Sequence, residues 1–339
     1  MLAPQQRNEN VTLADVAALA GYSVSAVSKA LLGGGGRTTK VSDKTAARIK
    51  DAADRLGYRP NSAARQLKTG KSRMIAALIH GNAPRVLYDL FARVQKKLAD
   101  MGYCFVVAQS EGNPDLLERN LNEFRSRNAD VIISAFHEYP GQGRLRKIYS
   151  AFDNVFYIGK PDIDDACYVE ADIRNGIVQL VDYLAVKGAK RIMLDITDRF
   201  YRCVRERIDG YLEGLKKNQI PLDEKMMIDY DGDLDSVSSI IKNVVALKPD
   251  AIIAENDLRA LKIIKGLKVM KIKVPDDIMV TGFDNMEFAA SVSPSLTTVD
   301  QRNDKLAYAV TKMLELFLES GKFPSSAIIR PELIIGESA

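Results

Sequence analysis

The residues from Val24 to Leu31 place small, hydroxylated and basic side chains along one predicted helix. Its apolar residues recur at helical spacing on one side, which leaves four outward side chains: Val24, Ser25, Ser28 and Lys29. A short apolar group can contact a thymine methyl, a hydroxyl can bond a base edge or a phosphate, and an ammonium can donate to guanine. This chemistry suits contact with base edges by Val24, Ser25 and Lys29, and with phosphate by Ser28.

Two further helices would have to hold that helix in place. Thr12 and Asp15 form a capped start for a helix with inward residues Leu13, Val16, Ala17 and Ala20, and Gly21 ends it. Ser23 can cap the second helix. A third helix is expected from Ser42 to Leu56, with Gly57 as its stop. Two short helices joined by a glycine-containing turn form a helix-turn-helix, whose second helix enters a DNA major groove.

The connections around the third helix are less regular. Before it lies GGGGRTTK, Gly33 to Lys40, which we interpret as a tolerated flexible insertion, although Arg37 and Lys40 could reach phosphate. After it, Asn61 can cap a short segment that ends at Lys68 and is too short to be a stable helix alone. Ala64 and Leu67 would share one face of this segment. A plain linker with a core-facing Leu67 is the alternative.

Charge and cysteine content limit the class of protein. Residues 1–73 hold 13 Lys and Arg against 5 Asp and Glu, whereas the remainder of the 339 residues is mildly acidic. This asymmetry fits phosphate contact by the first part only, or simply solubility. The N-terminus, which we expect to be disordered, shows no signal sequence, and no stretch could span a bilayer. Cys104, Cys167 and Cys203 lack metal-ligand spacing, so we expect small core residues in a reduced cytoplasm.

From Met74 onward, short apolar runs alternate with amphipathic helices, which predicts parallel strands covered on both faces. We expect two similar α/β lobes, with ligand binding at the carboxyl ends of the strands in the cleft between them. The predicted strands are 74–79, 104–108, 130–134, 155–159, 191–195, 225–229, 250–254 and 278–282. The predicted helices include 88–101, 174–187, 203–218, 236–247 and 258–270.

Several motifs together resemble the LacI/GalR (lactose-repressor) family of bacterial transcription regulators. In the first part they are TLADVAALAG, the SxxxVSKAL of the second helix and LGYRPNSAARQLKTGKS. The resemblance implies a homodimer on a palindromic operator in double-stranded DNA. It also implies a hinge helix that orders over the minor groove, with Leu67 as a wedge between base pairs. The DNA-binding residues would then include Asn61, Ala64, Leu67 and Lys68.

The rest of the chain resembles the family's effector domain, which is like a periplasmic binding protein. The matching pieces include DIRNG, RIDGY, AENDLRA, VPDDIMVTGFDN and SPSLTTVDQ. By position, the resemblance implies that a small effector, sugar-like or a related polar metabolite, contacts Asp172, Arg207, Asn256 and Asp284. Each has an alternative: Asp172 and Asn256 could cap helices, Arg207 could form a surface ion pair, and Asp284 could anchor its loop. We expect Asp257 to be a cap.

Departures from the family pattern restrict what can be carried over. Ile173, Ala189 and Gly336 replace the usual Asn, His and Arg, and Leu234 lies where some relatives stack an aromatic ring on the ligand. Lys160 could favour an acidic ligand. The effector therefore cannot be named from the motifs.

Catalysis finds little support, because His80 and His137 are the only histidines and lie on different segments. The predicted organisation is a disordered 1–10, a helix-turn-helix headpiece at 11–59, a hinge helix and linker at 60–73 and a two-lobed effector and dimerisation domain at 74–339. We predict a transcription repressor with no enzymatic activity, cofactor or metal. A solute-binding protein would need a signal sequence and no headpiece, and a sugar-modifying enzyme would need a catalytic constellation.

Overall fold

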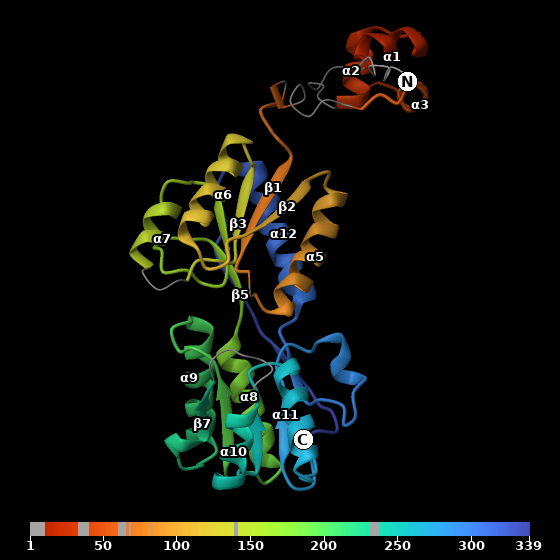
Figure 1. The fold of residues 1–339 in the computed structure, drawn as a ribbon. Helices are drawn as coiled ribbons and strands as arrows, with labels where there is room; N and C mark the ends of the chain where they lie inside the picture. The colour runs from red at the N-terminus through yellow and green to blue at the C-terminus, as the bar shows by residue number, and fades with distance from the viewer. Residues whose placement is uncertain are drawn as a thin grey trace, which may run out of the picture. The chain divides into compact units, whose positions relative to one another are not determined.

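The structure is a computed structural model that describes residues 11–32, 41–59, 66–67, 69–81, 83–138, 142–230 and 237–339 (Figure 1). Contacts divide the chain into two compact units, Met1–Arg73 with Arg127–Asp130, and Met74–Ser126 with Val131–Ala339. No helix in the described ranges combines the length and apolarity that crossing a membrane requires.

The first unit contains three helices, α1 (Leu13–Ala20), α2 (Val24–Leu32) and α3 (Asp43–Leu56). Thr12 and Asp15 form the predicted capping box of α1, and Gly21 ends this helix at a φ of 74°. Ser23 Oγ accepts a hydrogen bond from Ala26 N at 3.2 Å, which caps α2. The three helices share a small core: Val16, Ala17, Ala20, Val27, Ile49, Ala52, Ala53 and Tyr58. The predicted helix-turn-helix is therefore confirmed.

Part of the predicted DNA-contacting surface lies outside the described residues. This applies to 1–10, to Gly33–Lys40 and to three hinge residues, Asn61, Ala64 and Lys68. Leu67 is described: it is helical, and its side chain is 90% exposed. The alternative in which Leu67 faces a core is therefore wrong.

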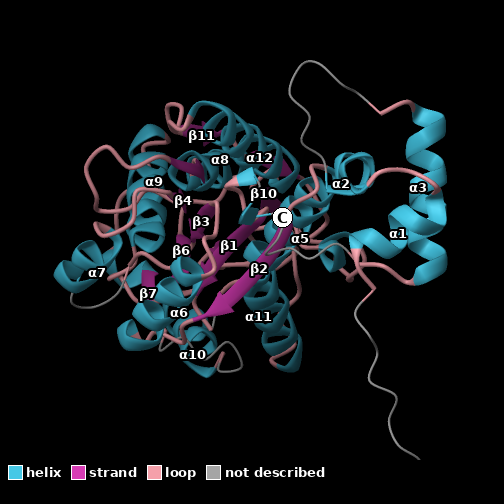
Figure 2. Cartoon of the chain, turned by 90° about the horizontal axis from the view of Figure 1, so that it is seen from above, coloured by secondary structure: helices cyan, strands magenta, loops and turns pink. Residues whose placement is uncertain are grey.

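The first lobe of the second unit is built on a parallel sheet of order β11-β5-β4-β3-β1-β2. Its core combines the sheet with α5 and α12, which pack together (Figure 2). The strands are β1 (Met74–Ile79), β2 (Cys104–Gln109), β3 (Val131–Ser134), β4 (Val155–Ile158), β5 (Tyr168–Ala171) and β11 (Ala327–Ile329). The helices are α5 (Arg85–Asp100), α6 (Pro114–Ser126), α7 (Gln142–Tyr149) and α12 (Asn303–Ser320).

The second lobe has a parallel sheet of order β7-β6-β8-β9 and an antiparallel pair, β10 with β12. Apolar clusters cover both faces of the sheet. The strands are β6 (Ile192–Ile196), β7 (Met227–Asp229), β8 (Ala251–Ile253), β9 (Met279–Thr281), β10 (Thr298–Asp300) and β12 (Glu332–Ile334). The helices are α8 (Ile173–Val186), α9 (Arg202–Lys217), α10 (Ser238–Leu247) and α11 (Asp257–Val269), with short 3-10 turns at Glu224–Met226 and Glu287–Ala290.

The chain crosses between the lobes after β5, which belongs to the first sheet, and it crosses again around α12 and β11. All eight predicted strands are present, and their ends lie within two residues of the predicted bounds. The sequence analysis missed β5, β10, β11 and β12, each of which is only three or four residues long. The prediction of two α/β lobes is confirmed.

Candidate functional site

The outward face of α2 matches the predicted division of its side chains. Val27 is fully buried, and Ala30 and Leu31 pack against the small core. Val24 and Ser25 are exposed, whereas Ser28 and Lys29 are half-buried. The helix therefore offers a row of short side chains with a lysine at its C-terminal end, and no bulky residue among them keeps the backbone away from a partner.

In the second unit, polar residues gather where the four strands of the second lobe end. Thr197 follows β6, Tyr230 follows β7, Glu255 follows β8 and Asp284 follows β9. Thr197 Oγ1 donates to Glu255 Oε1 at 2.7 Å, and the Tyr230 hydroxyl donates to Glu255 Oε2. Since ligands bind at the carboxyl ends of parallel strands, this edge is the candidate site.

Arg207, on α9, is the least satisfied polar side chain at this edge. It is 7% exposed, its guanidinium stacks on the Phe283 ring at 4.2 Å from the centroid, and its Nη1 is buried without a hydrogen-bond partner. The predicted alternative of a surface ion pair is wrong. A buried donor without an acceptor costs about 1–3 kcal/mol, which an incoming acceptor would recover.

Asp284 lies close to Arg207. Burial raises the pKa of Asp284 to about 7 against the opposing Arg207 guanidinium, and the Asp257 and Glu255 carboxylates raise it further. Gln301 Nε2 donates to Asp284 Oδ1 at 2.6 Å, so this residue also anchors its loop, as the alternative expected. Its φ of 108° is a conformation that L-residues rarely adopt. Strain of this kind is typical of functional positions.

Asp172 and Asn256 both cap helices. Asp172 Oδ1 accepts from Asn175 N at 3.0 Å at the start of α8, and Asn256 Oδ1 accepts from Arg259 N at 2.9 Å at the start of α11. Each keeps a side chain that is only half-buried. Capping uses one oxygen of Asp172, so this carboxylate retains acceptor capacity.

The prediction that Asp257 caps a helix is wrong. Asn256 occupies the cap position, and Asp257 is the first residue of α11 with no exposed surface. Its carboxylate accepts from Met286 N at 2.6 Å and from Thr298 Oγ1 at 2.5 Å. Burial raises the pKa of Asp257 to about 6. Asp257 therefore fixes the loop that carries Asp284.

The sequence analysis missed a charged network under this edge. Asp195 and Arg259 form an ion pair of 2.7 Å in which both side chains are 0% exposed. The Arg259 guanidinium lies 4.0 Å from the centroid of the Tyr230 ring, whose hydroxyl holds Glu255. The sequence did contain one indication of this pair: Asp195 ends the apolar run RIMLD, and Arg259 lies on the inner face of α11.

Arg202, the first residue of α9, connects the two lobes. Its guanidinium contacts Glu170 of β5 at 2.6 Å and 3.3 Å, and also Glu206. Its backbone N–H donates to Glu138 Oε2 at 2.8 Å. Burial raises the pKa of Glu206 to about 7 against the Arg202 guanidinium, and the nearby carboxylates of Glu170, Asp172 and Glu138 add to the rise. A cavity of about 420 Å³ borders Glu170, Asp172, Arg202 and Glu206.

The remaining described residues that the sequence analysis singled out do not belong to the polar edge of the second lobe. Lys160 is exposed, and its backbone N–H donates to Glu170 at 2.9 Å. His80 packs edge-on to Phe136 at 5.4 Å, and burial lowers the pKa of His137 to about 4. Cys104 and Cys203 are exposed and only Cys167 is buried, so the expectation of three core cysteines is wrong. Leu234 lies outside the described residues.

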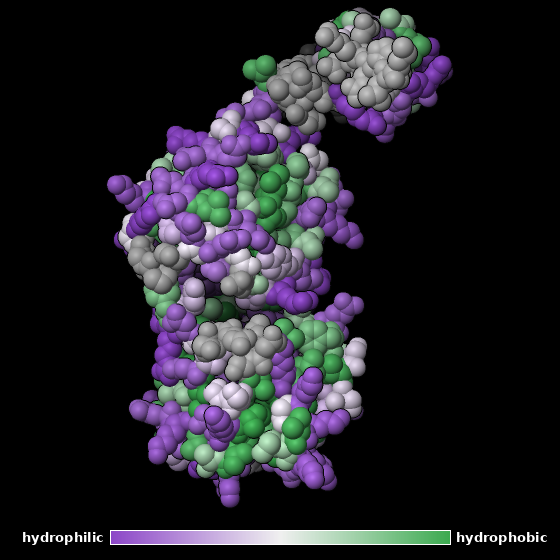
Figure 3. All heavy atoms as spheres, viewed as in Figure 1, coloured by the Kyte–Doolittle hydropathy of each residue, from purple (hydrophilic) through white to green (hydrophobic). Residues whose placement is uncertain are grey.

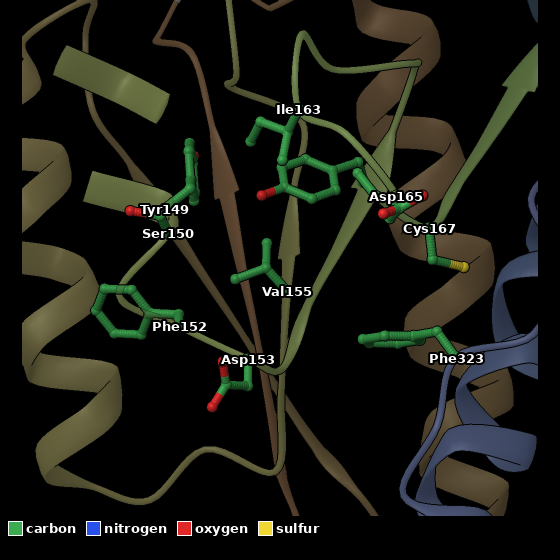
Figure 4. A pocket seen from close by; sticks show the side chains of 11 residues that line it. Tyr149, Ser150, Phe152, Asp153, Val155, Ile163, Asp165, Cys167 and Phe323 are labelled. Carbon is green, nitrogen blue, oxygen red and sulfur yellow. The ribbon is translucent and has the colours of Figure 1, made fainter. Parts of the chain in front are cut away.

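A second cavity, of about 190 Å³, lies inside the first lobe and contains none of the predicted site residues (Figure 4). Tyr149, Phe152, Val155 and Phe323 are among the residues that line it. The described ranges contain no group of three or more His, Cys, Asp or Glu side chains that could hold a metal ion.

Comparison with known families identifies both parts of the chain. Residues 12–61 match the family "Bacterial regulatory proteins, lacI family", and residues 181–339 match "Periplasmic binding protein-like domain". The ribose operon repressor of Escherichia coli is 26% identical over 300 residues, which cover 87% of this chain and 89% of that protein. The PurR repressor of Mannheimia succiniciproducens is 24% identical over 331 residues, which cover 96% and 98%.

Solved structures share the fold. The lac repressor bound to ONPG in the repressed state has a TM-score of 0.81 and 21% identity, over 98% of this chain and 100% of that one. The transcriptional regulator CelR in complex with cellobiose has a TM-score of 0.71 and 24% identity, over 97% and 100%.

Proposed function

Because the chain belongs to the lacI family of bacterial regulatory proteins, we propose that it binds operator DNA through α2 and the hinge, as a transcription repressor controlled by a small effector. It is a sequence-specific DNA-binding regulator and not an enzyme. The proposed place of action is the cytoplasm, where bacterial operators are.

The proposed DNA-contacting residues in the headpiece are Val24, Ser25, Ser28 and Lys29. The exposure of Val24 and Ser25 supports base contact, since short side chains allow close approach of α2 to the groove floor. In the hinge, the 90% exposure of Leu67 supports its role as a wedge in the minor groove, with Asn61, Ala64 and Lys68 as further contacts.

Binding-site selection tests this assignment. Exchanging Val24 and Ser25 together for the pair of another family member should change the preferred half-site, while phosphate contacts and the salt dependence stay the same. Selection of an unchanged operator by the exchanged protein would exclude base reading by these two residues.

The proposed assembly is a homodimer on a two-fold-symmetric operator. Val106 and Val107 of the edge strand β2 and Tyr88 of α5 are exposed apolar side chains of the first lobe. Apolar residues gather over this part of the lobe in Figure 3. An exposed apolar patch on an edge strand is typical of an interface. Sedimentation of the protein with its operator should give two chains per site, and replacement of Val106 and Val107 by Lys should shift the free protein toward monomer.

The proposed effector site is the cleft that contains Arg207, Asp284, Asn256 and Asp172. One observation carries it: Arg207 has a buried Nη1 without a partner, next to a carboxylate whose pKa burial has raised. A polyhydroxylated ligand offers both the acceptor for Arg207 and donors for Asp284. The relatives named for ribose and the CelR–cellobiose complex favour a sugar-like effector.

Operator titration with and without ligand tests the coupling of the two sites, with D-ribose and cellobiose as first probes. Coupling free energies are typically about 1–3 kcal/mol, so a bound effector should change operator affinity by roughly 5–150-fold. Arg207→Ala should remove this change while operator binding persists, and Leu67→Ala should weaken operator binding while ligand affinity persists. A full ligand response in the Arg207→Ala protein would exclude the proposed cleft.

A further inference from the structure

Glu255 is a carboxylate in the proposed cleft that the resemblance to the family did not indicate. It lies two residues after the end of β8 and directly before the Asn256 cap, so its place is set by a strand and a helix rather than by a long loop. Each of its two oxygens accepts one hydrogen bond, from Thr197 and from Tyr230. A carboxylate oxygen has a second lone pair, so Glu255 can still accept from a ligand.

The buried ion pair below Glu255 fixes its orientation. Arg259 stacks on the Tyr230 ring and pairs with Asp195 through two hydrogen bonds of 2.7 Å and 3.1 Å. A fully buried ion pair is weak evidence of added stability, because desolvation opposes the attraction between the charges. Its structural effect here is specific: it holds the ring whose hydroxyl aims at Glu255. Tyr230 and Arg259 are therefore positioning residues.

Carboxylates outnumber guanidinium groups in this cleft. Glu138, Glu170 and Glu206 surround Arg202, while Asp257, Asp284 and Glu255 lie around the Arg207 position. The cavity of about 420 Å³ is also lined by Arg174 and Arg205 and by Asp172 and Asp209, so its wall adds as many carboxylates as guanidinium groups. A negative, partly desolvated cleft favours a cationic ligand and opposes an anionic one.

Arg207 supplies the second, independent sign of a ligand. Its side chain is more than nine-tenths buried, yet Nη1 has no acceptor. The Arg207 guanidinium lies close enough to Asp284 to lower the pKa of that carboxyl, and Glu255 lies close enough to raise it. Arg207, whose Nη1 needs an acceptor, and Glu255, whose carboxylate can bind a cation, therefore lie at the same edge of the lobe.

We propose that the effector is a hydroxylated primary amine, such as an amino sugar, whose ammonium group binds Glu255 and whose hydroxyl oxygens accept from Arg207. This inference rests on the proposed effector cleft and names the class of ligand it takes. Glu255 is the residue that discriminates an amine from a hydroxyl at this place.

Matched sugars of different charge test the proposal. D-glucosamine, D-galactosamine and D-mannosamine would each be titrated calorimetrically into the full chain, beside the parent sugar that carries a hydroxyl in place of the amine. D-glucuronate and D-galacturonate represent the anionic class. At least one amino sugar should bind tenfold or more tighter than its parent, and the uronates should bind weakest.

Three variants locate the preference. Glu255→Gln keeps one acceptor oxygen and places an NH2 donor opposite the other hydroxyl, which can accept, but it loses the charge. The amine preference should therefore disappear while affinity for the neutral parent stays within threefold. Tyr230→Phe keeps the ring beneath Arg259 and removes the hydroxyl, so the preference should fall by a smaller factor. Glu224→Gln, at an exposed carboxylate of the same lobe, is the matched control and should change neither affinity.

Each outcome decides the proposal. Tighter binding of neutral or anionic sugars, failure of every amino sugar to bind, or an undiminished preference in Glu255→Gln would each overturn it. If neutral sugars bind tightest and their binding requires Arg207, the proposal of an amine ligand would be overturned, while the proposed position of the effector site would stand. An effector response that does not need Arg207 would instead overturn the cleft.

Discussion

The two lobes of the effector unit have similar parallel sheets but end their strands with different chemistry. In the first lobe the polar groups that meet at the end of β3 are neutral: Ser134 Oγ lies 2.6 Å from the Tyr149 hydroxyl, which donates to Phe136 O at 2.5 Å. Aromatic rings pack edge to face beside them, including Tyr149 on Tyr157. In the second lobe the corresponding edge holds the Asp195–Arg259 ion pair and the carboxylates of Glu255 and Asp284.

The first lobe therefore relies here on neutral hydrogen bonds, and the second lobe relies on paired charges. A neutral hydrogen bond contributes about 0.5–1.5 kcal/mol, and loss of one neutral partner costs less than loss of a charged one. A buried ion pair depends on both partners, since removing one leaves an uncompensated charge. The second lobe should therefore be far more sensitive to single substitutions than the first, and it is the lobe that supplies the proposed specificity.

The largest expected effect comes from breaking the buried pair. Arg259→Met should destabilise the protein by about 3–5 kcal/mol, because Asp195 then remains buried and unpaired. The double variant Asp195→Leu with Arg259→Met removes both charges and should recover most of that loss. Urea unfolding of the two proteins measures the difference. Equal losses in the single and double variants would show that packing, and not charge, sets the cost.

The next effect concerns the close contact of α8 and α9 in the second lobe. A Cβ on Gly214 would lie 2.6 Å from Val181 Cβ, so Gly214→Ala should cost about 1–3 kcal/mol through overpacking. Gly143, in α7 of the first lobe, is the matched control, because a Cβ there meets nothing within 4 Å. Gly143→Ala should leave the melting temperature unchanged or raise it slightly. A similar loss in both variants would remove the contrast between the lobes.

The neutral network of the first lobe should give a smaller change. Tyr149→Phe removes the hydroxyl shared with Ser134, but Ser134 Oγ still donates to Phe136 O at 3.1 Å. We therefore expect a loss of about 1 kcal/mol, measured by urea unfolding under the conditions used for Arg259→Met. A loss as large as that of the broken ion pair would contradict the proposed difference between the neutral network and the ion pair.

The last expected effect is a dependence of stability on pH. The folded pKa values of Asp284 and Glu206 are both raised to about 7, so between pH 4 and pH 7 the folded state binds more protons than the unfolded state. The contribution of these groups to stability is therefore present at acidic pH and is lost as the pH rises through 7. Asp284→Asn should flatten this part of the melting-temperature profile. An unchanged slope would exclude Asp284 as its source.

The headpiece could be predicted almost residue by residue, because its signals are local. Thr12, Gly21 and Ser23 act within a few positions of themselves, and they cap the helices as expected. The cleft was less accessible, since its contacts join residues far apart in sequence. Glu255 lies 58 positions from Thr197, and Arg259 lies 64 from Asp195. The spacing of residues along the chain does not predict contacts over such separations. Arg207 and Asp284 were therefore identified only through the family resemblance, and Glu255 was missed.

Helix α9 carries three tasks on successive turns: Arg202 meets the first lobe, Arg207 faces the proposed ligand, and Gly210 and Gly214 lie against α8. Each inserted or deleted residue would rotate everything beyond it by about 100° around the helix axis. Evolution can therefore revise this helix by exchanging side chains but not by changing its length. A lineage that acquires a new effector should keep the number of residues from Arg202 to Gly214 and substitute the residues between them.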